Sequence, residues 1–130
     1  MYLTEPKGIN MCFNVDKKHP HARTAKRAIV CFKVVNRDLC SYYQGFGHEY
    51  GFLAKSRLKK EKRGTNGTCI YMGFHSYTCF EAAMKEYRCK LSYDPIVVRC
   101  LLPRGTRYYY DSCDHEFVSN RIVVERKVLG

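Results

Sequence analysis

The chain has 130 residues, 45% of them apolar, and 23 Lys/Arg against 12 Asp/Glu give it a formal net charge of +11. This length predicts one domain over residues 1–130 with a modest core, and the apolar fraction excludes a disordered chain. No segment approaches the roughly 18 apolar residues of a membrane span. The N-terminus lacks the charged stretch and apolar run of a secretory signal. We therefore expect an intracellular protein with no membrane partner.

The first half of the chain predicts short strands between basic segments. Residues 1–24 are poorly patterned and broken by proline, which is typical of an irregular N-terminal arm. Residues 27–35 are rich in β-branched side chains and predict a central strand, apolar on both faces except at Lys33. Two weaker strands are expected at 39–43 and 50–54. The basic run at 55–63 has no apolar stripe, so it predicts a loop rather than a packed helix.

The second half contains the clearest helix pattern. Thr78 and Glu81 have the spacing of a capping box, and apolar residues then recur at helical spacing from Phe80 to Leu91. The pattern predicts a helix over about residues 79–91. Strands are expected at 69–72, 96–102, 106–110 and 122–124. Together these elements predict an α+β fold: a mostly antiparallel sheet of six to seven short strands with the main helix on one face.

The positive charge is concentrated in the first half of the sequence. Residues 1–65 hold 14 Lys/Arg against 5 Asp/Glu, whereas residues 66–130 hold 9 against 7. Clustered cations favour a polyanionic partner because they neutralise phosphates and release counterions, although most charge runs are simply solvated surface. The predicted nucleic-acid-binding residues are Lys55, Arg57, Lys59, Lys60, Lys62 and Arg63 in the basic run, and Lys17, Lys18, Arg23, Lys26 and Arg27 nearer the N-terminus.

Tyrosines near these clusters are candidates for contacts with unpaired bases. A base that stacks on an aromatic ring gains about 1–3 kcal/mol. Tyr42, Tyr43 and Tyr50 lie between the two basic clusters and are the predicted base-stacking residues. The alternative is that such rings serve as core or cross-strand partners. In the triple tyrosine at 108–110, alternation divides the rings between the two faces of a strand.

The eight cysteines and five histidines show no spacing that marks a metal or catalytic site. Cys-x-x-Cys and His-x(3–5)-His, the spacings of convincing zinc sites, do not occur. Reduced cysteines packed as small core residues are expected, with zinc binding and disulfides as alternatives. We predict no catalytic residue, no metal and no cofactor, and hence no enzyme. One alternative is a small-ligand pocket at His75, just before the predicted helix.

Three motifs stand out in the second half of the chain. The segments GFHSY (73–77), IVVRCLLPRGTRYYY (96–110) and FVSNRIVV (117–124) resemble small uncharacterised proteins encoded by bacteriophages and prophages, over about residues 68–126. Small single-domain phage proteins of no enzymatic type are often inhibitors of host defence, anti-CRISPR proteins among them. The resemblance therefore implies a phage protein in the cytoplasm of a bacterial host.

A more distant similarity is to ADP-ribosyltransferase-like folds. These folds share a late strand followed by a Pro-Lys/Arg-Gly turn, here Pro103-Arg104-Gly105. Their Ser-Thr-Ser segment and paired glutamates are absent from this sequence. The similarity implies a ligand pocket as an alternative function and carries over no catalytic residue.

Charge and resemblance together lead to one main hypothesis. It is a small, basic, non-enzymatic phage-type protein that docks on RNA or on a ribonucleoprotein such as a CRISPR effector and inhibits host defence, a host–virus interaction. The first alternative is a protein-binding module that engages an acidic partner surface. The second is the small-ligand or ADP-ribosyltransferase-like pocket protein.

Overall fold

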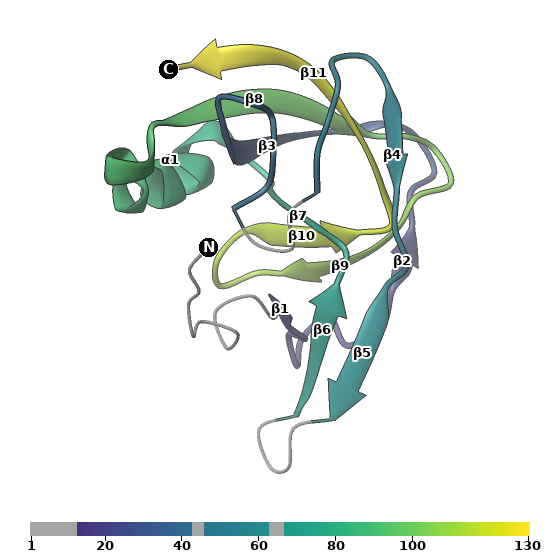
Figure 1. Cartoon of the computed structure of the whole chain (residues 1–130). Coiled ribbons are helices and arrows are strands. Elements are labelled where there is room, and N and C mark those ends of the chain that lie inside the picture. Colours follow the sequence, from purple (N-terminus) through teal and green to yellow (C-terminus); the bar gives the residue numbers. More distant parts are fainter. Residues whose placement is uncertain (1–12, 43–45, 63–66) are drawn as a thin grey trace.

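The computed structural model describes residues 13–42, 46–62 and 67–130, which form two antiparallel sheets and one α-helix (Figure 1). The strands are β1 (Phe13–Asn14), β2 (Arg23–Thr24), β3 (Ile29–Asn36), β4 (Leu53–Lys55), β5 (Lys59–Lys62), β6 (Thr68–Met72), β7 (Phe74–Tyr77), β8 (Pro95–Leu102), β9 (Arg107–Asp111), β10 (Glu116–Ser119) and β11 (Arg121–Leu129). The helix α1 spans Phe80–Cys89, and a 3-10 helix, η3, spans Leu91–Tyr93. In these described residues, neither helix is both long and apolar enough to cross a bilayer.

The α+β class and the mostly antiparallel sheet are confirmed, but the prediction of six to seven strands was too low. The β-branched run forms β3, which pairs with β8 along its whole length and with β7 on its other side, so its central position is confirmed. Two of the extra strands are β7, which is only four residues long, and β5, in the basic run that was predicted to be a loop. β5 pairs with β6 as an edge strand, and an edge strand needs no apolar face.

The predicted helix is present, with different ends. Cys79 rather than Thr78 is its N-cap, and no side chain caps it. Thr78 precedes the N-cap, and its amide donates to the carbonyl of His115 at 2.9 Å. Most of the predicted stripe packs against the sheet: Ala83 is buried and Phe80, Met84 and Tyr87 are partly buried, in a cluster with Val34 and Val97. Leu91 falls outside α1 and is 59% exposed.

The larger sheet bends around one apolar cluster. Its strand order is β2-β9-β10-β7-β3-β8-β11-β4. Strands far apart in that order contribute to the same cluster, among them Phe117 on β10 and Ile122 on β11. The sheet therefore folds over this cluster, with β8 and β11 above β9 and β10 in Figure 1. Its outer face is covered by α1 and, over β9 and β10, by the three-stranded sheet β1-β6-β5.

A single residue, Asn120, joins β10 to β11 at the bend. Its amide donates to the carbonyl of Arg107 at 3.0 Å, and its side-chain Oδ1 accepts the amide of Arg107 at 2.9 Å. Its own carbonyl accepts the amide of Ser56 at 2.8 Å. Asn120 therefore holds together three segments that are distant in the sequence.

We expect Asn120→Ala to lower the free energy of unfolding by about 0.5–1.5 kcal/mol, because the variant loses one side-chain hydrogen bond. Urea denaturation followed by circular dichroism measures this change. Asn14→Ala, the same substitution at an exposed strand position, is the control and should change stability by less than about 0.5 kcal/mol. Equal effects of the two substitutions would contradict the role of Asn120.

The segment that begins at Phe46 covers one side of the apolar cluster. Phe46 and His48 pack their rings against Phe74, with centroid distances of 4.6 and 5.6 Å. His48 Nε2 is buried and has no hydrogen-bond partner among the described residues. Loss of hydration, and then the nearby Lys33 ammonium, lower the pKa of His48 from 6.5 to about 4. His48 is therefore neutral when folded near pH 7.

His48 should make the protein less stable as pH falls. Between pH 6.5 and about 4 the unfolded chain binds a proton at His48 that the folded chain does not, so stability decreases toward acid. The full effect is about 3 kcal/mol, which solvent screening of this half-buried ring reduces to about 1–2 kcal/mol. We expect His48→Phe to remove this part of the acid sensitivity. Denaturation curves at pH 7 and pH 4.5 measure the free energy of unfolding of both proteins. An equal decrease in parent and variant would contradict the role of His48.

Candidate nucleic-acid interface

Four chain segments meet at the end of the folded sheet where β10 turns into β11. Lys55 on β4 lies directly opposite Arg121 on β11. The turn before β9 joins the chain after β2 through two backbone hydrogen bonds of Ala25, one to Gly105 and one to Thr106, each 2.8 Å long. β2 then pairs with β9. These contacts link the segments into one continuous surface.

This surface carries only positive formal charge. The segments 22–29, 53–58, 103–108 and 119–122 contain eight Lys/Arg and no Asp or Glu. Within the described chain, none of the eight cations pairs with a carboxylate. Seven are exposed and Arg121 is half-buried. We call this surface the cationic end; its members are Arg23, Lys26, Arg27, Lys55, Arg57, Arg104, Arg107 and Arg121.

The eleven predicted nucleic-acid-binding residues do not all lie together. Five of them belong to the cationic end: Arg23, Lys26, Arg27, Lys55 and Arg57. Three others, Lys59, Lys60 and Lys62, lie on β5, which leads away from it along the β5–β6 hairpin (Figure 1). Arg63 lies outside the described residues.

Lys17 and Lys18 lie at the other end of β9. Asp16 accepts hydrogen bonds from the Ser112 amide at 2.9 Å and the Ser112 hydroxyl at 2.6 Å, and it also accepts the amide of Lys18 at 2.9 Å. These bonds, led by those from Ser112, lower the pKa of Asp16 to about 2. Ser112 follows the end of β9 opposite to Arg107. Lys17 and Lys18 are thus held away from the cationic end.

The turn between β9 and β10, which contains Ser112, is acidic. Carboxylate oxygens of Asp111, Asp114 and Glu116 lie within 4.8 Å of one another, and burial raises the pKa of Asp111. Exposed acidic groups of this kind are common without a metal ion. The carboxylates give this end of β9 the opposite charge to the cationic end.

Sequence reasoning missed three members of the cationic end. Arg104, Arg107 and Arg121 come from the half of the chain where the charges nearly balance. The signal available in the sequence is local: no Asp or Glu occurs between Arg99 and Asp111, or between Glu116 and Glu125. Folding brings these acid-free stretches beside the basic ones.

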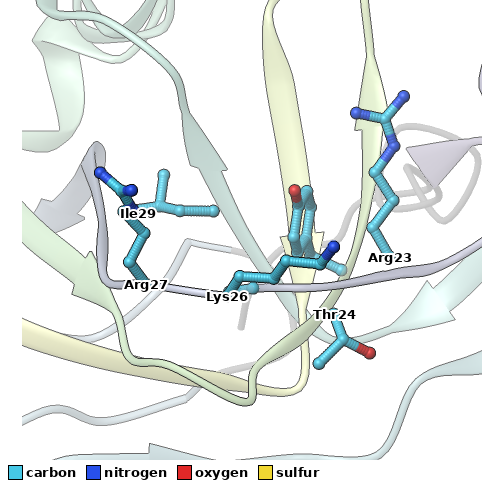
Figure 2. Close-up of a pocket in the computed structure, with 7 residues that line it drawn as sticks. Arg23, Thr24, Lys26, Arg27 and Ile29 are labelled. Carbon is cyan, nitrogen blue, oxygen red and sulfur yellow. The ribbon is translucent and has the colours of Figure 1, made fainter.

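A pocket of about 460 Å³ opens within the cationic end (Figure 2). Arg23 and Arg27 lie at the two ends of the segment that borders it, with Lys26 between them. Two of its lining residues, Ile29 and Tyr108, also pack against the central apolar cluster. The pocket therefore combines cationic and apolar walls. Its lining residues are Arg23, Thr24, Ala25, Lys26, Arg27, Ile29 and Tyr108.

Tyr42 and Tyr50, the two predicted base-stacking tyrosines within the described residues, do not line this pocket. The Tyr42 hydroxyl donates to the carbonyl of Tyr93 at 3.0 Å, Lys90 Nζ lies 5.8 Å from the centre of its ring, and burial raises its pKa to about 12. Tyr93 lies just before β8, at the end of that strand opposite to the cationic end. Tyr50 is 44% exposed in the turn before β4. Tyr43 lies outside the described residues.

His75, the predicted alternative site, lies within β7 rather than beside the start of α1. Its Nδ1 is 2.9 Å from a Glu116 carboxylate oxygen, and both side chains are less than one-fifth exposed. Its Nε2 is buried and has no hydrogen-bond partner among the described residues. A general base must reach the group whose proton it removes. Among the described residues, His75 Nε2 therefore hydrogen-bonds to no Ser, Thr or Cys side chain.

The described cysteines are all free, and three of them are buried: Cys31, Cys69 and Cys100. Cys31 on β3 lies directly opposite Cys100 on β8. Burial raises the pKa of Cys100 well above its usual value and lowers the pKa of Lys33, which is 5% exposed and donates to the carbonyl of His75 at 2.6 Å. These groups lie in the packed interior.

Comparison with known proteins found no match. No protein-family model matches the chain, and neither a curated protein nor a solved structure resembles it significantly. Both resemblances drawn from the sequence therefore stay predictions.

Proposed function

We propose that this protein is a non-enzymatic RNA-binding module that holds the RNA backbone against the cationic end. The observation that carries the proposal is the gathering of eight cations from four segments that contain no carboxylate. Lysines and arginines so placed neutralise phosphates and release the counterions condensed on the nucleic acid. Contacts of this kind position a nucleic acid without reading its sequence.

The rigidity of the surface supports the proposal. Four of the cations, Arg23, Lys55, Arg107 and Arg121, are strand residues in the larger sheet. Lys26 and Arg104 each adjoin a residue, Ala25 and Gly105, that is fixed by backbone hydrogen bonds. Because the backbone positions are set before binding, less ordering free energy opposes association than for a disordered basic tail.

The biological role that we propose is inhibition of host defence by competition for RNA. RNA-guided effectors hold nucleic acid in a positively charged channel through its backbone and shape. A basic inhibitor would compete with such a channel for the RNA, whereas an acidic inhibitor would occupy the channel itself. The net charge of +11 favours the first arrangement.

A protein partner with an acidic surface is the second candidate. Phe52 and Leu53 are 61% and 45% exposed, next to Lys55 on the edge strand β4. Exposed apolar residues beside a cation on a sheet edge are suited to pairing with another chain. A complex that survives nuclease treatment would favour this candidate over RNA binding.

Removing three charges from the cationic end should weaken RNA binding and its salt dependence. We expect the variant Lys55→Gln, Arg104→Gln, Arg107→Gln to bind a single-stranded RNA about 10–100-fold more weakly at low salt. The slope of log K against log salt should become shallower by about 2, because each lost contact removes about 0.7. Fluorescence anisotropy with a labelled RNA at four salt concentrations measures both quantities.

A matched variant controls for the loss of net charge. Lys85→Gln, Arg88→Gln, Arg126→Gln removes three exposed cations from α1 and β11, outside the cationic end. It should keep most of the affinity of the parent protein. If the affinity of the parent protein does not change with salt, RNA binding through phosphate contacts is refuted. If the two variants lose equal affinity for RNA, the placement of the site at the cationic end is refuted.

A further inference from the structure

The pocket at the cationic end has one wall that packing holds rigid. The Tyr108 ring packs edge-to-face on Phe117, with centroids 5.3 Å apart and an interplanar angle of 83°. Ile29 lies opposite Leu102, which is fully buried, and packs against the same apolar cluster. Both residues also line the pocket. The apolar wall is therefore part of the core that reaches the surface.

The rest of the pocket lining is mostly cationic, and backbone hydrogen bonds hold its segment in place. Arg23 is paired with Tyr108 across β2 and β9. Ala25 is 3% exposed, and its amide and carbonyl are both hydrogen-bonded to the turn before β9. Lys26 and Arg27 follow this anchor at the pocket border (Figure 2). The guanidinium of Arg23 is further held 2.8 Å from His19 Nδ1.

We propose that this pocket holds one unstacked nucleotide of a single-stranded RNA, with its base on Tyr108 and Ile29 and its phosphates beside Arg23, Lys26 and Arg27. A nucleotide joins a flat apolar base to an anionic phosphate, which matches the two walls. The volume of about 460 Å³ lies within the range of about 300–1,000 Å³ that small-ligand sites show. An inorganic anion would leave the apolar wall unused.

The pocket predicts a preference for strand type, and this inference rests on the proposed function. Bases inside a duplex are paired and stacked, so they cannot enter a pocket without being extruded. Bases of a single strand can be splayed onto an aromatic ring. The cationic end alone would bind both forms, whereas the pocket adds binding only for the single strand.

We expect Tyr108→Leu to weaken binding of a ten-nucleotide single-stranded RNA about 5–100-fold, because a stacked base contributes about 1–3 kcal/mol. Its affinity for a ten-base-pair RNA duplex should stay within twofold of the parent protein. The slope of log K against log salt should not change, because no charge is removed. Tyr108→Phe should keep the single-strand affinity.

The controls separate stacking from folding and from charge. Tyr71→Leu makes the same change at a 40% exposed tyrosine on β6, outside the pocket, and should bind like the parent. Arg27→Gln changes an exposed rim residue and should lower both the single-strand affinity and the salt slope. Ultraviolet crosslinking of the RNA to the parent protein, followed by peptide mapping, should label the peptide that contains Tyr108. This test uses the parent protein alone, so it does not depend on whether Tyr108→Leu folds.

The outcomes for the pocket and for the proposed function are distinct. If single-stranded and duplex RNA bind the parent equally, or crosslinks avoid the peptide that contains Tyr108, the pocket proposal is overturned and the cationic end stands. If neither RNA binds the parent at low salt, the proposed function itself fails. If folded Tyr108→Leu loses as much affinity for the duplex as for the single strand, the pocket proposal is also overturned.

Discussion

The bend of the larger sheet around its apolar cluster is the constraint on which the site depends. β10 and β11 are separated by Asn120 alone, yet they are the third and seventh strands of the sheet order. The chain must therefore pass from one layer to the other within one residue, and the hydrogen bonds of Asn120 to Arg107 and Ser56 hold this corner. Burial of the cluster stabilises the bend, and the bend brings the ends of β4, β9 and β11 together.

The cationic end is costly to the folded state. Lys55 and Arg121 are directly opposite on neighbouring strands, an arrangement that destabilises a sheet. In other parts of the described chain, three cations do lie beside carboxylates, in the ion pairs Arg99–Glu125, Arg37–Asp94 and Lys90–Glu86. A surface with only a structural role gains from mixing charges of both signs. An RNA bound as we propose would supply the negative charge that the four segments of the cationic end lack.

The sequence predicted the elements whose patterns are set locally. The run that became β3 and the stripe of α1 were found because β-branched composition and helical spacing depend only on neighbouring residues. β5 was missed because its pairing with β6 is made by the backbone and leaves no apolar alternation. The sequence predicted only some members of the cationic end, because nearness in the sequence does not ensure nearness in the fold. Lys17 is near Arg23 in the sequence, but the hydrogen bonds of Asp16 with Ser112 hold Lys17 at the other end of β9. Arg107 and Arg121 join the site only through the bend.

The two parts of the proposed site respond differently to salt, and this difference gives each a separate role. Phosphate contacts weaken steeply as salt rises, because they depend on counterion release. Stacking of a base on Tyr108 involves no net charge and keeps its strength. As ionic strength increases, the share of the binding free energy that comes from the pocket grows. Under the salt conditions of a cell, the cationic end would then supply fast, unselective association, and the pocket would decide which strands stay bound.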